Sequence, residues 1–245
     1  MESPFLQAHG LLRYIGLFLS GVCHQLPGHS LFLAAVQTPL CARCTGTYLG
    51  ALLGFCNSWR SGRARASRLP PARVLAVLAL FFAFWAADGL NSYLHFINLG
   101  VGLYPPSNFL RLTAGMVNGI SLSLLVLPMF NLALWREADR RQVLNGLAEL
   151  GSILLQGLAL EILLEADIGA LLYPLLVMDL GGVLLMLSIV NSIIVLILLR
   201  MENQAERWRQ ALLPFSLGLL LSVVEVGSLA ILRYLLAPVL PSPIL

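Results

Sequence analysis

Runs of apolar residues long enough to cross a lipid bilayer recur along this chain. A helix needs about 20 predominantly apolar residues to cross the hydrocarbon core of a membrane. Hydrophobic residues make up 58% of the sequence and charged residues 11%, whereas a soluble domain carries about 25% charged residues. The sequence therefore predicts an all-α, polytopic helical membrane protein.

Polar connections divide the apolar sequence into seven segments, which predicts about seven transmembrane helices. The segments cover residues 8–22, 45–59, 73–92, 109–135, 143–166, 172–200 and 210–236. We expect a short first helix rather than a cleavable signal peptide, because the bulky Val22 stands where a small residue usually precedes cleavage. The sixth segment contains Asp179, Gly181 and Gly182, so a broken or re-entrant helix is expected there.

Arginine residues gather in alternate connections and predict the orientation of the chain in the cell membrane. The connections after the second, fourth and sixth segments are basic, and basic connections stay in the cytoplasm. Their arginines are Arg60, Arg63, Arg65, Arg68, Arg73, Arg136, Arg140, Arg141, Arg200, Arg207 and Arg209. The amino terminus is then predicted to be cytoplasmic and the carboxyl terminus extracytoplasmic. The net charge of +3 is too small and too dispersed to indicate a nucleic-acid partner.

The same orientation places most polar residues of the apolar segments in the extracytoplasmic half of the bundle. Ionisable groups at membrane depth are costly and usually face a protein interior or water. The polar residues concerned are Asp88, Asn91, His95, Asn108, Arg111, Glu161, Glu165, Asp167, Asp179, Glu225 and Arg233. We therefore expect an outward-opening polar cavity at this end.

Three cysteines and a histidine lie within one short connection on that side. The connection opens with Cys23 and His24 and closes with the sequence PLCARCTG, residues 39–46. Two thiolates at C-x-x-C spacing can bind one tetrahedral ion, and a further thiolate and an imidazole would complete a zinc site. We predict a metal site, with zinc as the expected ion and Cys23, His24, Cys41 and Cys44 as ligands. Adjacent residues rarely both bind one ion. In the alternative arrangement the three cysteines are the protein ligands, and His24 lies beside them without binding the ion.

Two other uses of these cysteines remain open. Thiols outside the cytoplasm tend to oxidise, so a C-x-x-C pair beside a third cysteine could exchange electrons with a membrane quinone. A structural disulfide between Cys23 and one member of the pair would need no cofactor. Residues 30–40 are expected to form a short hairpin over the site, and Cys56, within the second segment, is expected to be buried.

These motifs resemble those of the DUF2085 family of predicted membrane proteins. The resemblance rests on Cys-His-Gln and on Pro-Leu-Cys-Ala-Arg-Cys-Thr-Gly. Asp88-Gly89 is similar to the Asp-Gly motif of that family, and Ser107-Asn108 followed by Arg111 is similar to its Ser-Asn-x-x-Arg motif. Gly28-His29 departs from the acidic and basic pair that usually follows the first proline.

The resemblance covers about residues 15–125 and implies a membrane protein of unknown function. It supports the site without naming a reaction. We therefore divide the chain into a DUF2085-like membrane region with the cysteine and histidine cluster, residues 1–135, and additional transmembrane helices of unknown role, residues 136–245.

Five polar residues near the predicted site are candidates for chemistry on a substrate. Asp88, Glu161 and Glu165 are candidate catalytic residues, because carboxylates with separated pKa values do acid–base work. Asn108 and Arg111 are candidates for binding an anionic substrate, since a guanidinium binds phosphate or carboxylate through two hydrogen bonds. Structural roles compete with these: an ion pair of Arg111 with Asp88, a helix cap at Asn108, and an arginine bridge to the two glutamates.

Glycines recur every four residues in the second and fourth segments, a spacing that lets helix backbones approach closely. We expect these two helices to pack tightly near the cysteines. The glycines are Gly46, Gly50, Gly54, Gly115 and Gly119.

Two classes of function follow from this sequence, and it leaves open whether the protein is an enzyme. One is a membrane enzyme whose metal activates water against a lipid-borne or small anionic substrate, with a thiol–quinone oxidoreductase as its metal-free variant. The other is a non-catalytic subunit or carrier in which the metal or a disulfide is structural. The expected partners are membrane lipid and a small-molecule or lipid substrate.

Overall fold

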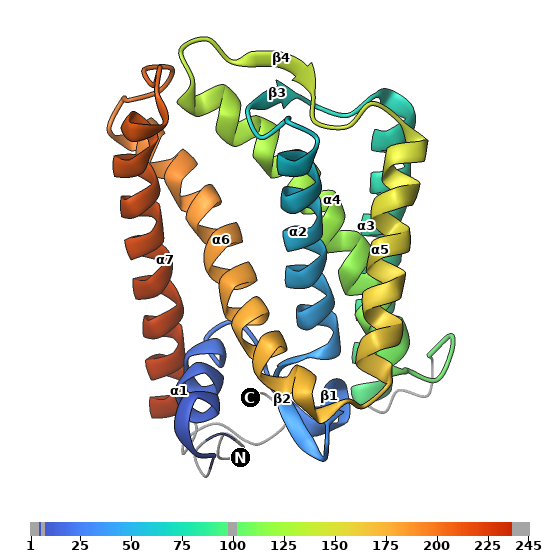
Figure 1. Ribbon diagram of the computed structural model, residues 1–245. Helices are drawn as coiled ribbons and strands as arrows, with labels where there is room; N and C mark the ends of the chain where they lie inside the picture. Colours follow the sequence, from blue (N-terminus) through green and yellow to red (C-terminus); the bar gives the residue numbers. More distant parts are fainter. Residues whose placement is uncertain (1–4, 6–7, 98–101, 237–245) are drawn as a thin grey trace.

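The chain folds into a bundle of helices with a small two-stranded sheet at each end (Figure 1). A computed structural model describes residue 5 and residues 8–97 and 102–236. Within these residues the helices are α1 (Gly10–Leu19), α2 (Ala42–Arg60), α3 (Ala72–Phe96), α4 (Asn108–Leu134), α5 (Leu147–Glu165), α6 (Leu172–Leu198) and α7 (Trp208–Leu236). The strands are β1 (Ser30–Leu33), β2 (Val36–Cys41), β3 (Ala66–Arg68) and β4 (Asp139–Gln142), and short 3₁₀ helices cover Pro27–His29 and Gly169–Leu171.

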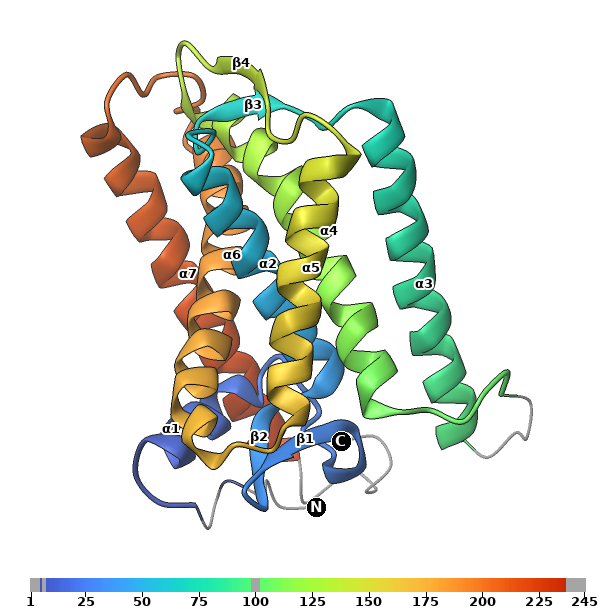
Figure 2. The same cartoon turned by 45° about the vertical axis from the view of Figure 1, so that its right-hand side comes forward.

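Five helices are long and apolar enough to cross a membrane, namely α3, α4, α5, α6 and α7. The 19-residue α2 also runs along the bundle between them (Figure 2). The 10 residues of α1 extend about 15 Å, which is too short to cross a hydrocarbon core of about 30 Å. The class of polytopic helical membrane protein is confirmed, whereas the count of seven crossings is not.

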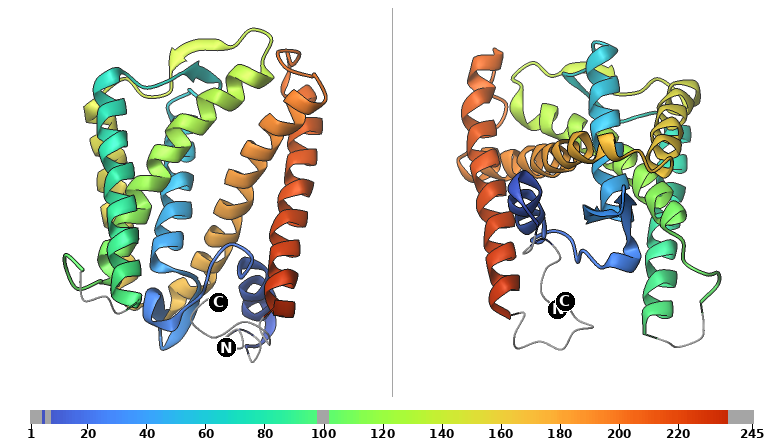
Figure 3. Two further views of the ribbon diagram at one scale, coloured as in Figure 1. Left: turned by 180° about the vertical axis from the view of Figure 1, so that it is seen from behind. Right: turned by 60° about the horizontal axis from the view of Figure 1, so that its bottom comes forward.

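The short α1 lies at the end of the bundle that carries β1 and β2, beside the carboxyl-terminal part of α7 (Figure 3). Gly21 permits this close approach, because a Cβ atom there would stand 2.2 Å from the carbonyl oxygen of Val226. α1 and the carboxyl end of α7 therefore lie at the same end. The prediction of termini on opposite sides depended on a full crossing by the first segment.

The glycines of α2 and α4 bring the two helix backbones into contact, as the sequence predicts. A Cβ atom on Gly46 would lie 2.1 Å from the carbonyl oxygen of Leu112, and one on Gly119 would lie 1.8 Å from that of Thr47. The surrounding core draws on residues from both predicted regions of the chain, including Leu49, Leu112 and Ile153. This contact fixes the position of the amino end of α2, where two of the cysteines lie.

The expectation of a broken sixth segment is wrong, because α6 is one continuous helix of 27 residues. Gly182 serves packing rather than a break. A Cβ atom on Gly182 would stand 2.9 Å from the Cβ atom of Tyr48 on α2. Asp179 lies one turn earlier and is fully buried against the neighbouring helices.

The prediction that Cys56 is buried is also wrong, since its side chain is exposed. The buried stripe of α2 follows Gly46, Gly50 and Gly54. At about 100° per residue, a side chain two positions after Gly54 points away from that stripe.

Candidate metal centre

Cys41 and Cys44 are placed together by the start of α2. Cys41 ends β2 in an extended conformation and is the N-cap residue of α2, and Cys44 lies in the first helical turn. Side chains at the N-cap and three residues later point the same way, as in a capping box. The amino end of a helix also favours negative charge, so this position suits thiolates.

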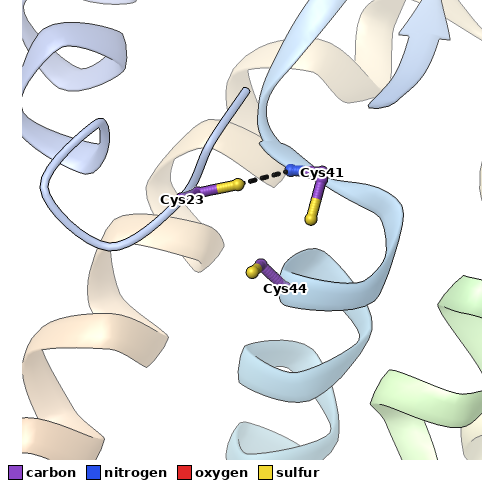
Figure 4. Close-up of side chains that lie close together, drawn as sticks. All are labelled: Cys23, Cys41 and Cys44. Atoms are coloured by element: carbon purple, nitrogen blue, oxygen red, sulfur yellow. Dashed lines mark hydrogen bonds between the residues drawn. The ribbon is translucent and has the colours of Figure 1, made fainter. Parts of the chain in front are cut away.

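Cys23 reaches the other two cysteines from the loop that follows α1 (Figure 4). Its Sγ accepts a hydrogen bond from the backbone N–H of Cys41 at 3.1 Å. The Sγ atoms of Cys23, Cys41 and Cys44 all lie within 4.8 Å of one another, and none of the three forms a disulfide. Cys23 and Cys41 are buried and Cys44 is partly buried.

A two-stranded hairpin leads into Cys41, which confirms the hairpin predicted for residues 30–40. β1 and β2 pair antiparallel, with Ser30 opposite Cys41. Gln25 links the Cys23 loop to this hairpin, because its side-chain amide donates to the carbonyl oxygens of Gly16 at 2.7 Å and Pro39 at 2.8 Å. Gln25 is buried and has a φ of 56°. The glutamine after Cys23 and His24 therefore holds the loop in place.

His24, the predicted fourth ligand, lies exposed at the edge of the cluster. Its Nδ1 accepts a hydrogen bond from the backbone N–H of Leu26 at 3.0 Å, which leaves the other ring nitrogen available. The pKa of the Cys41 thiol is lowered by hydrogen bonds with Cys23 and Cys44, and His24 lowers it further. Hydrogen bonding to Cys41 raises the pKa of Cys23 to about 12. Three of the four predicted ligands are thus gathered, and His24 as a ligand stays a prediction.

Asp88 pairs with Arg43 rather than with Arg111, so the predicted ion pair between Asp88 and Arg111 is wrong. Arg43, between the two cysteines of α2, makes a salt bridge to the carboxylate of Asp88. Tyr104 donates to the other carboxylate oxygen at 2.9 Å. Both oxygens of this fully buried carboxylate are therefore occupied. Nothing in the sequence singled out Arg43 as the partner, because the rotation of α2 decides which arginine faces α3.

Arg111 is buried and its hydrogen bonds go to uncharged acceptors. It donates to Asn108 Oδ1 at 2.8 Å, to the carbonyl oxygen of Gly28 at 3.3 Å and to Ser92 Oγ at 3.4 Å. Asn108 donates in turn to the carbonyl oxygen of Ser30. The N-cap of α4 is Ser107, whose hydroxyl accepts from the N–H of Leu110. Asn108 thus connects Arg111 to the hairpin rather than capping the helix.

The two candidate acids of α5 differ in their surroundings. Glu161 accepts a hydrogen bond from Thr113 at 2.8 Å, whereas Glu165 is exposed. Asp167 accepts from the backbone N–H of Ala34 in the hairpin turn. Glu161 and Glu165 as catalytic residues, and an outward-opening cavity that joins them to the cysteines, stay predictions.

Arg233 of α7 holds the loop that carries Cys23 and His24. Its guanidinium donates to the carbonyl oxygens of Ser20 at 3.1 Å and His24 at 2.6 Å, and also to that of Cys23. The alternative in which an arginine bridges the two glutamates of α5 is therefore wrong for Arg233. The sequence could not indicate this contact, because it joins residues more than 200 positions apart.

Asp179 of α6 lies on the inner side of the cluster. The distance from its Oδ2 to the hydroxyl of Thr45, which follows Cys44, is 3.5 Å. Its Oδ1 is buried and has no hydrogen-bond partner among the described residues. The carboxyl-terminal half of the chain therefore contributes two polar residues to the surroundings of the cysteines, Asp179 and Arg233.

His29 lies in the turn that precedes the hairpin, among the charged groups of this end. Its ring centroid is 5.2 Å from that of His24. Burial lowers the pKa of His29 to about 4, and Arg111, His24 and Arg43 lower it further while Cys41 opposes them. His29 is consequently neutral at neutral pH.

Together the fold and the site define a multi-pass helical membrane protein with a buried three-cysteine cluster at one end of its bundle. Residues 23–125 match the family described as "Predicted membrane protein (DUF2085)", which confirms the resemblance seen in the motifs. The match covers all three cysteines, Asp88 and Arg111, and it ends before α5.

Over 109 residues the chain is also 28% identical to an uncharacterized protein of Methanocaldococcus jannaschii. That alignment covers 44% of this chain and 64% of the relative, which is less than two thirds of its length. No solved structure matches the chain.

Proposed function

We propose that this protein binds one zinc ion through Cys23, Cys41 and Cys44, with His24 as the fourth ligand. The gathering of the three sulfur atoms within 4.8 Å, without a disulfide, carries the proposal. Three thiolates and one imidazole form a common tetrahedral zinc set. A backbone N–H already directed at Cys23 Sγ is the kind of hydrogen bond that supports a metal-bound thiolate.

The charges around the cluster support an anionic metal complex. Zn²⁺ with three thiolates and a neutral imidazole has a net charge of −1. Arg43 is neutralised by Asp88, whereas Arg111 donates to uncharged acceptors in the contacts described above. An anionic complex near this guanidinium group would offset part of the cost of holding its positive charge in a buried site.

We place the metal centre on the extracytoplasmic side of the cell membrane. The cysteines lie at one end of the bundle and the arginine-rich connections with β3 and β4 at the other. Basic connections stay in the cytoplasm, so the opposite end faces outward. In this orientation α1 and the carboxyl end of α7 are both extracytoplasmic, which revises the predicted side of the amino terminus.

The reaction we favour is metal-assisted chemistry on a lipid-borne or small anionic substrate, which requires the exposed His24 to give up its position on the ion to water or substrate. Arg111 supports this choice, because a buried guanidinium whose hydrogen bonds within the described residues go to uncharged acceptors can bind a phosphate or carboxylate group. If His24 closes the coordination sphere and no substrate binds, the metal is structural, as in the non-catalytic alternative.

Metal content of the purified protein tests the proposal. We expect about one equivalent of zinc per chain in the wild type and in Cys56→Ser, whose exposed side chain lies outside the cluster. Cys41→Ser should retain less than about one fifth of that content, because one of three thiolate ligands is lost. An inductively coupled plasma measurement on protein purified without added metal gives the values.

The opposite pattern would favour one of the alternatives. Metal-free wild-type protein with a disulfide at Cys23, found by mass spectrometry after alkylation, would support redox thiols or a structural disulfide. Equal metal in the wild type and in Cys41→Ser would exclude the proposed ligand set.

A further inference from the structure

A cavity of about 960 Å³ opens at the arginine-rich end of the bundle, opposite the cysteines. Residues from the end of α2, from β4 and its flanks, and from the start of α7 line it; these elements meet at the top of Figure 1. Its lining includes Trp59, Arg65, Glu137 and Trp208. The cysteine, Asp-Gly and Ser-Asn-x-x-Arg motifs contribute no residue to the lining of this cavity, and neither does the proposed metal centre.

The charges that line the cavity are balanced, but two of them are unpaired. Three arginines face three acidic residues there. Arg136 pairs with Glu206 at 2.6 Å and Arg141 with Asp139 at 2.7 Å. The remaining pair is Arg65 and Glu137, and neither has a salt bridge within the part of the chain that the structure describes. The cavity therefore offers one cation and one anion to a ligand.

Arg65 is held in a fixed orientation by aromatic rings. Its guanidinium carbon lies 3.7 Å from the centroid of the Trp135 ring and 5.9 Å from that of Trp208. Trp135 is itself fixed by a hydrogen bond from its indole N–H to Asn131. A cation–π contact does not use the N–H groups of a guanidinium as donors to oxygen acceptors. The Arg65 guanidinium makes no hydrogen bond among residues 8–97 and 102–236, so its donors suit a phosphate group.

The position of the cavity indicates a ligand from the lipid headgroup layer. It lies at an end of helices that are apolar enough to cross a membrane. Trp59 is 79% exposed and Trp208 is 55% exposed, and both line the cavity. Exposed tryptophan rings are typical of the membrane–water interface, where headgroups lie.

We propose that this cavity binds the headgroup of a zwitterionic phospholipid with a primary ammonium, such as phosphatidylethanolamine. The phosphate binds Arg65, and the ammonium lies at Glu137. A net-neutral headgroup matches a lining in which one positive and one negative charge are free. A quaternary ammonium has no N–H to donate to the Glu137 carboxylate, so the cavity discriminates against phosphatidylcholine. Phosphatidylglycerol has no cation for that carboxylate.

Native mass spectrometry of the full-length protein in detergent, titrated with one lipid at a time, tests this proposal. We expect phosphatidylethanolamine to bind about tenfold more tightly than phosphatidylglycerol or phosphatidylcholine. Arg65→Gln should weaken binding of phosphatidylethanolamine about tenfold, because the phosphate loses a bidentate partner. Glu137→Gln should reduce the preference over phosphatidylglycerol. The matched controls Arg207→Gln and Glu202→Gln change charges at the same end outside the cavity lining and should bind lipid as the wild type does.

Two results would overturn the proposal. One is equal affinity for the three lipids, and the other is wild-type binding by Arg65→Gln. Glycerophosphoethanolamine, the soluble headgroup, is the competitor that distinguishes the source of the ligand. Binding of this compound as tightly as the lipid would contradict a membrane ligand. Circular dichroism of the same samples reports the fold, and zinc content tests the metal proposal separately. A metal-free protein that still selects phosphatidylethanolamine would refute only the metal proposal.

Discussion

Asp88 illustrates how a residue of the motif acts through its partners. Its carboxylate accepts from Arg43 and from Tyr104, and it is fully buried. This arrangement fastens α3 and the loop after it to the turn of α2 that lies between the cysteines. We infer that Asp88 positions the cysteine site and is not free for proton transfer.

Replacing Asp88 by Asn should lower the free energy of unfolding by about 3 kcal/mol, because the mostly buried guanidinium of Arg43 would lose its counter-charge. Chemical unfolding in detergent micelles measures the change. Glu165→Gln removes an exposed acid of α5 and should leave stability within about 0.5 kcal/mol of the wild type. Similar stability in all three proteins would contradict the role given to the ion pair.

His29 should make the stability of the protein depend on pH. Its pKa is about 4 in the folded protein, below the usual value of 6.5. Between these values the unfolded chain binds more protons at this position than the folded one, so stability rises with pH. The contribution is fully present above pH 6.5 and is lost as the pH falls toward 4.

Melting temperatures of the wild type and His29→Gln, measured from pH 4 to pH 7, test this expectation. The difference between the two proteins isolates His29 from carboxylates that titrate in the same range. We expect the wild type to lose more stability than the variant on acidification, and parallel curves would show that His29 is not responsible.

At the scale of elements, α2 is the centre of the architecture. Its glycine face lies against α4 and its first turn carries two of the cysteines. A substitution in the middle of this contact should therefore disturb the metal centre as well as the bundle.

Gly119→Ala should be strongly destabilising, since the added Cβ atom would stand 1.8 Å from the backbone oxygen of Thr47. Gly181→Ala on α6 is the matched control, because its Cβ atom would meet nothing within 4 Å. Alanine there should be neutral or stabilising by up to about 1 kcal/mol, the usual gain over glycine in a helix. Thermal unfolding in micelles measures both, and equal effects would contradict the close contact.

The elements themselves could be predicted well, because apolar length is a local property of the sequence. The long segments, the hairpin over residues 30–40 and the contact of α2 with α4 all follow from composition and spacing. The continuity of α6 could not be predicted, since Gly182 looks like a helix breaker until Tyr48 is known to lie against it. Whether α1 crosses the membrane depends on its length, and its 10 residues are too few to cross the hydrocarbon core.

The candidate site was predictable only in part, for a similar reason. Cys41 and Cys44 are brought together by one helix turn, so their spacing alone is informative. The contacts of Gln25, Arg43 and Arg233 depend on how distant elements pack, and no local pattern records them.

At the scale of the whole molecule, the two ends of the bundle differ in chemistry. One end carries the cysteines, and the other carries the arginine-rich connections and the cavity with Arg65. This polarity implies one fixed orientation in the membrane.

Labelling with a membrane-impermeant maleimide in intact cells tests the orientation, in a Cys56→Ser background. Pro27→Cys, in the turn before the hairpin, should react from outside. Gln204→Cys, between α6 and α7, should react only after the cells are permeabilised. The reverse pattern would place the cysteine cluster in the cytoplasm and overturn the orientation.

The central claim is that Cys23, Cys41 and Cys44 bind one zinc ion together. X-ray absorption at the zinc edge of the purified protein tests it most directly, because it counts the ligand atoms. We predict three sulfur neighbours at about 2.3 Å and one nitrogen neighbour at about 2.0 Å. A zinc ion surrounded only by oxygen and nitrogen, or a protein without zinc, would contradict the claim.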